Sequence, residues 1–168
     1  MKYIVVGLGN FGAYLATRLT NLGHEVIGID TREAKIVLLK DSITHVIMMD
    51  ATDAQALKTL PYKDVDVVIV AIGEDFGASI MVTALFKQLN VKRLIGRSIN
   101  KVHETVITAI GVDEIIHPEE DSAERMAKKL QMMSPTAHHA GSPSYNHKAS
   151  IKVWCTHPSI HPSIHPSI

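Results

Sequence analysis

The stretch Gly7-Leu8-Gly9-Asn10-Phe11-Gly12 decides the fold class of this chain. It follows the apolar run Tyr3–Val6 and opens the helical pattern Phe11–Leu22, so it is expected to turn a strand into a helix. Gly7 would permit the tight turn, Gly9 would let the backbone approach a pyrophosphate, and Gly12 would let the helix pack on the strand. Free N–H groups at the helix start would then attract phosphates. A plain turn with incidental glycines is disfavoured by the three correctly spaced glycines.

Short β-rich runs alternate with helical patterns over the first 133 residues. This alternation predicts an α/β, doubly wound Rossmann-like fold with a parallel six-stranded sheet and a C-terminal crossover helix. The almost continuously apolar run Val65–Ile72 is expected to be a central strand buried on both faces. The other expected strands are Tyr3–Val6, Glu25–Ile29, His45–Met48, Arg93–Arg97 and Glu114–His117. The expected helices are Phe11–Leu22, Arg32–Lys40, a short one capped by Thr52 or Asp53, Glu74–Asn90, Lys101–Ile110 and Glu119–Met133.

The composition limits the classes of protein to which the chain can belong. Its 168 residues are 46% hydrophobic and 20% charged, which is typical of one globular domain. With 17 basic and 17 acidic side chains and no basic block, nucleic-acid binding is not expected. The single cysteine, Cys155, excludes an internal disulfide framework and is compatible with the cytoplasm. No apolar run reaches the roughly 18 residues of a membrane span, and no signal peptide is expected.

The chain changes character after residue 133. Residues 1–133 are expected to form one nucleotide-binding domain, and residues 134–168 a disordered tail rich in Ser, Pro and His. Because the tail ends in three copies of His-Pro-Ser-Ile, it is interpreted as a remnant of expression or an out-of-register extension. The alternative is a His-rich metal tract. Its regularly spaced prolines, however, forbid the helix that would bring those histidines to one face.

Asp30 ends the second expected strand, 18 residues after Gly12. A carboxylate at this place accepts hydrogen bonds from both ribose hydroxyls and repels a 2′-phosphate, which favours NAD(H) or adenosine phosphates over NADP(H). The alternative is an N-cap for the helix that begins at Arg32, and Asp30 can serve both roles. Arg32 slightly weakens the exclusion of NADP(H). Thr31 and Arg32 complete this part of the predicted site.

Other candidates follow the ends of later strands, at the sheet edge where ligands of such folds bind. Asp50-Ala51-Thr52 would lie by the adenine, although a capped helix start is an equally good interpretation. Ala71-Ile72-Gly73 would form an apolar floor under the nucleotide, or ordinary core. Arg97 would pair with a phosphate or with a nearby carboxylate, and the sequence does not decide between these.

The acidic run Glu119-Glu120-Asp121 begins the last expected helix. Carboxylates at a helix start are stabilised by the helix dipole, and this is the favoured interpretation. The alternative is a divalent cation such as Ca²⁺ or Mg²⁺ held between subunits, with Glu119 among its ligands. Four histidines are scattered singly and are interpreted as surface or strand-end residues, namely His24, His45, His103 and His117.

Catalytic machinery is not evident in the sequence. It contains no Tyr-x-x-x-Lys pair, no Gly-x-Ser-x-Gly and no Walker-type Gly-Lys-Ser/Thr. A second domain that would complete a substrate pocket beside a nicotinamide is also not expected. The chain is therefore expected to be a binding protein, with a small NAD-dependent oxidoreductase as the alternative. A redox-sensing repressor is a weaker reading, since no basic DNA-reading helix supports it.

Five segments together resemble the KTN, or RCK amino-terminal (TrkA-N), family, whose domains regulate potassium uptake systems and some potassium channels. The resemblance covers residues 1 to about 133. The last of the segments separates this family from generic Rossmann enzymes. They are Val6-Gly7-Leu8-Gly9-Asn10-Phe11-Gly12, Gly28-Ile29-Asp30, Asp50-Ala51-Thr52-Asp53, Val70-Ala71-Ile72-Gly73 and Gly111-Val112-Asp113-Glu114-Ile115-Ile116-His117-Pro118-Glu119.

The resemblance implies a cytoplasmic regulatory subunit, peripheral at the inner face of the cell membrane, docked on a potassium-translocating membrane subunit. Such domains form homodimers that assemble into rings, usually octamers, and bound NAD(H), ATP or ADP changes the shape of the ring. By match, Gly7, Gly9 and Gly12 would hold phosphates, Asp30 the ribose, and Asp50 with its neighbours the adenine. The last helix would cross to a partner lobe, and Glu119 matches an acidic position of an intersubunit cation site.

The chain departs from the family pattern at two places. Some members carry arginine where Asn10 stands, and there it reaches the phosphates of a neighbour's nucleotide. Asn10 has no charge, so strong discrimination of that type between ATP and ADP is not expected. Members also continue into a carboxyl-terminal RCK domain, which residues 134–168 do not resemble. The chain is therefore interpreted as a truncated piece that binds ligand without gating fully.

Overall fold

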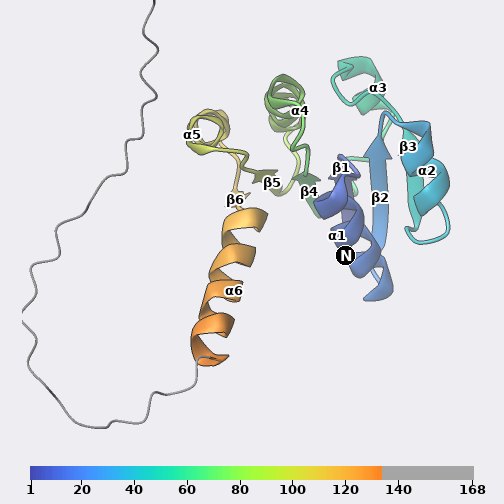
Figure 1. Cartoon of the computed structure of the whole chain (residues 1–168). Coiled ribbons are helices and arrows are strands. Elements are labelled where there is room, and N and C mark those ends of the chain that lie inside the picture. The colour runs from blue at the N-terminus through green and yellow to red at the C-terminus, as the bar shows by residue number, and fades with distance from the viewer. Residues whose placement is uncertain (134–168) are drawn as a thin grey trace, which may run out of the picture. The chain divides into compact units, whose positions relative to one another are not determined.

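The computed structural model describes residues 1–133, in which strands and helices alternate along the chain (Figure 1). The tail predicted for residues 134–168 lies outside the described residues. The strands are β1 (Lys2–Val6), β2 (Glu25–Asp30), β3 (His45–Met48), β4 (Val67–Val70), β5 (Leu94–Arg97) and β6 (Glu114–Ile116). The helices are α1 (Asn10–Asn21), α2 (Glu33–Leu39), α3 (Ala54–Lys58), α4 (Phe76–Gln88), α5 (Lys101–Ile110) and α6 (Pro118–Met133).

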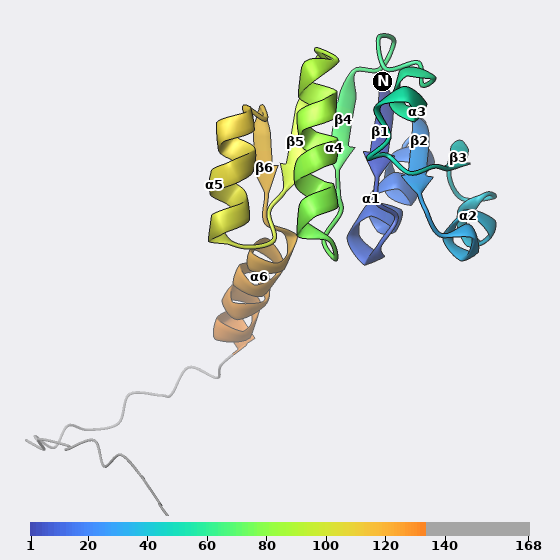
Figure 2. The same cartoon turned by 90° about the horizontal axis from the view of Figure 1, so that it is seen from above.

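The strands form one parallel sheet in the order β3-β2-β1-β4-β5-β6 (Figure 2). Tyr3 of β1 pairs with Val26 of β2 on one side and with Val67 of β4 on the other. The order reverses between β1 and β4, and this reversal is where ligands of doubly wound sheets bind, at the carboxyl ends of the strands. The predicted Rossmann-like fold is confirmed.

Apolar side chains of the central strands point alternately to the two faces of the sheet. Ile4 and Val6 of β1 belong to the cluster that contains Phe86 of α4. Val5 belongs to the cluster on the opposite face, with Ala16 of α1. Helices therefore cover both faces, which is why the residues of the central strand β4 are all buried.

The glycine loop brings the start of α1 against the end of β1. Gly7 has a φ of +92°, a conformation in which a side chain would be strained. A Cβ added at Gly12 would overlap the carbonyl oxygen of Gly7 and lie 3.1 Å from the Cβ of Ala71. At Gly9, in contrast, an added Cβ would meet no described atom within 4 Å. Two of the three glycines therefore serve the fold itself, while Gly9 faces open space.

Side-chain caps fix the starts of several helices. Asp53 accepts hydrogen bonds from the backbone N–H groups of Gln55 (2.8 Å) and Ala56 (3.4 Å) at the start of α3. Asp75 accepts from the N–H of Ala78 at 2.9 Å, so α4 begins two residues later than Glu74, where the sequence predicted it. Within residues 1–133, no helix combines the length and the apolar character needed to cross a bilayer.

The different surroundings of Gly12 and Gly9 predict different effects of the same substitution on stability. Gly12→Ala should lower the free energy of unfolding by about 3 kcal/mol, because backbone atoms must move to admit the methyl group. Gly9→Ala should change it by less than about 1 kcal/mol, since φ at Gly9 is −66° and the space is open. Urea unfolding followed by circular dichroism measures both values, and equal losses would contradict the described packing of α1.

Candidate functional site

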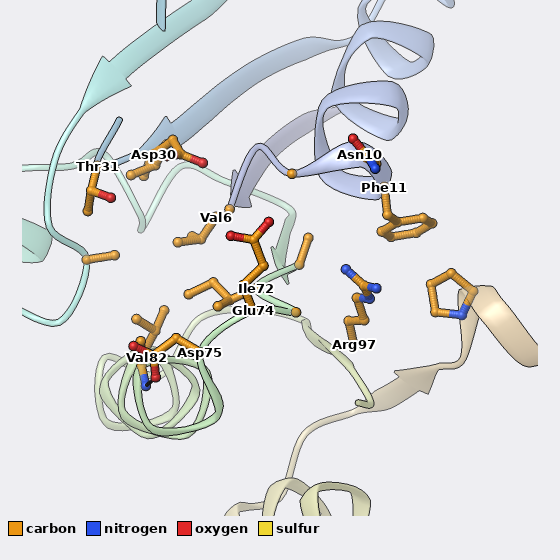
Figure 3. A pocket seen from close by; sticks show the side chains of 18 of the residues that line it. Val6, Asn10, Phe11, Asp30, Thr31, Ile72, Glu74, Asp75, Val82 and Arg97 are labelled. Carbon is orange, nitrogen blue, oxygen red and sulfur yellow. Dashed lines mark hydrogen bonds between the residues drawn. The ribbon is translucent and has the colours of Figure 1, made fainter. Parts of the chain in front are cut away.

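A cleft of about 1050 Å³ opens at the carboxyl edge of the sheet, where the strand order reverses (Figure 3). Its volume suits a nucleotide-sized ligand. All the predicted binding residues except Gly12 line it, and Gly12 lies instead against the Gly7 carbonyl. Their binding roles remain predictions. The lining residues among them are Gly7, Gly9, Asn10, Phe11, Asp30, Thr31, Arg32, Asp50, Ala51, Thr52, Ala71, Ile72, Gly73, Arg97 and Glu119.

The cleft also has walls that the sequence reasoning did not predict. Glu74 and Asp75 follow Gly73 directly at the same edge of the sheet, so the rule that selected Gly73 could have found them too. One wall comes from α6, and its position depends on the direction that the chain takes after β6. The unpredicted lining residues are Val6, Ile29, Met49, Glu74, Asp75, Ala78, Val82, Pro118, Ser122, Ala123 and Met126.

Asp30, at the end of β2, ties the glycine loop to the neighbouring strand. Its buried carboxylate accepts a hydrogen bond from the backbone N–H of Leu8 at 2.8 Å, through Oδ2, and from the N–H of Arg32 at 3.0 Å, through Oδ1. Arg32, not Asp30, occupies the N-cap position of α2. The carboxylate therefore holds two loops in place at the edge of the cleft, and the helix-capping alternative for Asp30 was wrong.

The side chain of Arg32 adds two further bonds to the same carboxylate. Its Nε lies 3.1 Å from Oδ1 of Asp30 and its Nη2 lies 3.4 Å from Oδ2, while its Nη1 lies 3.3 Å from Oε2 of Glu74. Burial opposes the ionisation of Asp30, but the hydrogen bonds from Arg32 and Leu8 outweigh it and hold the pKa of Asp30 below its ordinary value. Asp30 is therefore a carboxylate at neutral pH.

Asp50 lies after β3 and organises the turn that leads to α3. Its Oδ1 accepts hydrogen bonds from the hydroxyl of Thr52 at 2.7 Å and from the Thr52 backbone N–H at 2.9 Å. These bonds lower the pKa of Asp50. Since Asp53 caps α3, the Asp50 carboxylate serves the turn and remains exposed at the rim of the cleft.

Arg97 reaches from the end of β5 to the first turn of α1. Its guanidinium forms an ion pair with Glu119 at the start of α6 and lies 5.9 Å from the centre of the Phe11 ring. A Cβ at Gly73 would overlap this guanidinium, so the glycine makes room for it. Of the two interpretations of Arg97, the structure contains the ion pair with a carboxylate, and the phosphate contact remains a prediction.

The predicted cation site concerns the acidic start of α6. Among residues 1–133, no group of three or more His, Cys, Asp or Glu side chains is placed to hold a metal ion. Glu119, the predicted ligand, pairs with Arg97 instead. The divalent cation site therefore remains a prediction.

His103 is buried, and its interpretation as a surface residue was wrong. The start of α5 packs against α4, where the ring of His103 lies 5.0 Å from that of Phe76. The backbone N–H of Ile99 donates to Nδ1 at 3.3 Å, and burial lowers the pKa of His103. The ring is therefore neutral at pH 7 and belongs to the core.

A family model and several potassium uptake proteins match this chain in sequence. The family model of the TrkA-N domain matches residues 3–118. The Ktr system potassium uptake protein C of Bacillus subtilis is 39% identical over 129 residues, which are 77% of this chain and 58% of that protein. The Ktr system potassium uptake protein A of the same organism is 36% identical over the same shares. The chain thus spans less than two thirds of the length of these relatives.

Solved structures share the fold at lower sequence identity. The NAD(P)-binding domain of an exopolyphosphatase-related protein from Archaeoglobus fulgidus superposes with a TM-score of 0.69 at 23% identity, over 78% of this chain and 98% of that one. GsuK bound to ADP superposes with a TM-score of 0.64 at 22% identity, over 78% of this chain and 34% of that one. The family match covers most of the described residues, including the glycine loop and all six strands of the sheet. This chain therefore belongs to the TrkA-N family.

Proposed function

We propose that residues 1–133 are the nucleotide-sensing domain of a regulatory subunit of a potassium transporter or channel, and that the domain binds NAD(H) or ATP/ADP. The observation that carries the proposal is the cleft, which joins the glycine loop and the ionised Asp30 at the switch point of the sheet. The names of similar proteins support it: two are potassium uptake proteins, one is an NAD(P)-binding domain and one holds ADP.

The proposed ligand would extend across the ends of five strands, β1 to β5. Its phosphates would face the start of α1, where Gly9 is the N-cap and the first turn carries no acidic side chain to repel an anion. Its ribose would lie at Asp30, and its adenine near Asp50-Ala51-Thr52. Ala71-Ile72-Gly73 would form the floor, with Arg97 close to the phosphates.

A nucleotide would act by binding one conformation more tightly than another. Such coupling typically amounts to about 1–3 kcal/mol. The ion pair between Arg97 and Glu119 offers a physical route, because it joins the cleft to the first turn of α6. ATP and ADP differ in charge, and Asn10 gives the loop no positive side chain with which to tell them apart.

Helix α6 would provide the contact with a second copy of the chain. Three apolar side chains of this helix, spaced four and three residues apart, are each more than half exposed: Met126, Leu130 and Met133. This spacing gives an apolar stripe that a neighbouring subunit would cover. We propose homodimers that assemble into a ring, an octamer by family resemblance, on a potassium-translocating subunit at the inner face of the cell membrane. Glu119 would contribute to an intersubunit divalent cation site.

We propose that the protein is not an enzyme. Hydride transfer needs a catalytic acid or base beside the nicotinamide, together with a substrate pocket. The cleft of the described domain is lined by Asp and Glu side chains that already hold loops, caps or arginines, namely Asp30, Asp50, Asp75, Glu74 and Glu119. Sustained hydride transfer from NADH to any substrate, abolished by a substitution in the cleft, would favour the oxidoreductase alternative.

Calorimetric titration with NADH, NADPH, ATP and ADP tests the proposed ligand class. Asp30→Ala should weaken the binding of at least one of these ligands about tenfold or more, because it removes the carboxylate that holds the glycine loop through the N–H of Leu8 and that faces the ribose. Asp41→Ala, which removes an exposed carboxylate outside the cleft, is the matched control and should bind as the unchanged protein does. Equal affinities of Asp30→Ala and the unchanged protein for all four ligands would refute a role of Asp30 in ligand binding.

Sedimentation equilibrium tests the proposed role of α6. The unchanged chain should self-associate, and Leu130→Asp should weaken that association about tenfold or more by placing a charge on the apolar stripe. Lys128→Ala, two residues away and facing a different direction, should have little effect because its ion pair with Glu124 is exposed. A monomer at every concentration, or equal effects of the two substitutions, would remove α6 from the assembly.

A further inference from the structure

The Asp30 carboxylate is saturated with hydrogen-bond donors. An ionised carboxylate offers about four acceptor positions, two on each oxygen. Oδ1 accepts from the backbone N–H and the Nε of Arg32, and Oδ2 accepts from the backbone N–H of Leu8 and the Nη2 of Arg32. A ribose hydroxyl can therefore donate to Asp30 only if one of these four donors leaves.

The four donors differ in how easily they can leave. The N–H groups of Leu8 and Arg32 belong to backbone that the glycine loop and the start of α2 fix in place. The Arg32 side chain is 45% exposed, although the Asp30 side chain that it covers is only 5% exposed. Only the guanidinium can move away without unfolding a loop.

The two positions that the guanidinium occupies match the donors of a vicinal diol. Its Nε and Nη2 form a planar fork that supplies one donor to each oxygen of Asp30. The 2′- and 3′-hydroxyls of a ribose bind a carboxylate in the same way, with one donor to each oxygen. Arg32 thus makes on Asp30 the pair of contacts that an adenosine would make.

Glu74 gives the displaced side chain a second partner. Nη1 of Arg32 lies 3.3 Å from Oε2 of Glu74, whose side chain is 80% exposed. Figure 3 shows Glu74 entering the cleft from the segment after β4, while Asp30 enters from the end of β2. The ion pair therefore links the two sides of the cleft beside Asp30, and Arg32 can keep this bond while its contacts with Asp30 are exchanged.

We propose that Arg32 is a specificity-determining residue that competes with the vicinal hydroxyls of an adenosine ribose for Asp30. The proposal rests on the proposed nucleotide-binding function. Binding of the ribose then exchanges two side-chain hydrogen bonds for two others, so the hydroxyls contribute little net affinity while Arg32 is present. Removal of Arg32 leaves Asp30 with its two backbone donors and two open acceptor positions, and the hydroxyls then contribute fully.

Uncharged ligands test this competition, because removal of the positive charge of Arg32 does not change their electrostatic attraction to the cleft as it would for a phosphate-bearing ligand. Adenosine and 2′,3′-dideoxyadenosine would be titrated into the full chain and its Arg32→Ala variant, with affinities measured from NMR shift changes up to millimolar concentrations. The ratio of the dideoxyadenosine Kd to the adenosine Kd should rise at least about fivefold in Arg32→Ala. Arg93→Ala, which removes an arginine paired with Glu114 away from the cleft, should leave the ratio unchanged.

A second measurement follows the guanidinium directly. The Nε–H signal of Arg32 should shift when adenosine binds and should move far less with dideoxyadenosine, because only the former displaces it from Asp30. An unchanged ratio of Kd values in Arg32→Ala would refute the competition. A lower ratio would mean that Arg32 orients Asp30 for the ribose, which also contradicts it.

The outcomes separate this inference from the proposed function. If ADP or adenosine binds and Asp30→Ala weakens that binding, while Arg32→Ala leaves the ratio unchanged, only the role of Arg32 is wrong. If neither the unchanged chain nor any variant binds adenosine, ADP or NADH, both proposals are wrong. Circular dichroism of each variant establishes that it is folded, so a loss of binding is not a loss of structure.

Discussion

Helix α1 approaches strand β1 so closely that Gly12 rests on the carbonyl of Gly7. This contact sets where the helix begins and directs its first N–H groups toward the carboxyl edge of the sheet. It also holds the loop where the N–H of Gly7 reaches the carbonyl of Ile29 and the N–H of Leu8 reaches the carboxylate of Asp30, so hydrogen bonds join the loop to β2. The position of the helix start and of the buried Asp30 carboxylate in the cleft therefore depends on Gly12, where no side chain fits.

Charged side chains connect the walls of the cleft around this loop. Arg32 joins the end of β2 to Glu74 after β4, and Arg97 joins the end of β5 to Glu119 on α6. Each arginine is thus held between segments that lie far apart in the sequence. Guanidinium groups suit this role because their donors point in fixed directions and can serve two partners at once. A ligand that bound one partner of an arginine would therefore change the connection between two walls of the cleft.

Much of the fold could be predicted from the sequence, because local patterns of glycine and apolar residues determine where the strands and helices form. The glycine spacing and the apolar runs gave the strands and their parallel arrangement, and the edge rule brought Asp30, Asp50 and Arg97 to one cleft. The ion-pair partners of the charged side chains could not be predicted. Arg97 and Glu119, for example, are 22 residues apart and meet only because of the path that the chain takes after β6. His103 was misjudged for the same reason: its burial comes from packing between helices, which a single histidine in a sequence does not reveal.

The exposure of α6 has a consequence for its amide protons. Within the described chain, α6 is a helix of 16 residues in which none is buried, and Figures 1 and 2 show it projecting from the sheet beyond β6. A helix of this length is only marginally stable in water without packing. Its amide protons are therefore expected to exchange with solvent through local fraying, whereas exchange in β1 and β4 requires the whole sheet to open. A second subunit that covered α6 would slow exchange there, so the protection of this helix in the absence of ligand would report contact between subunits.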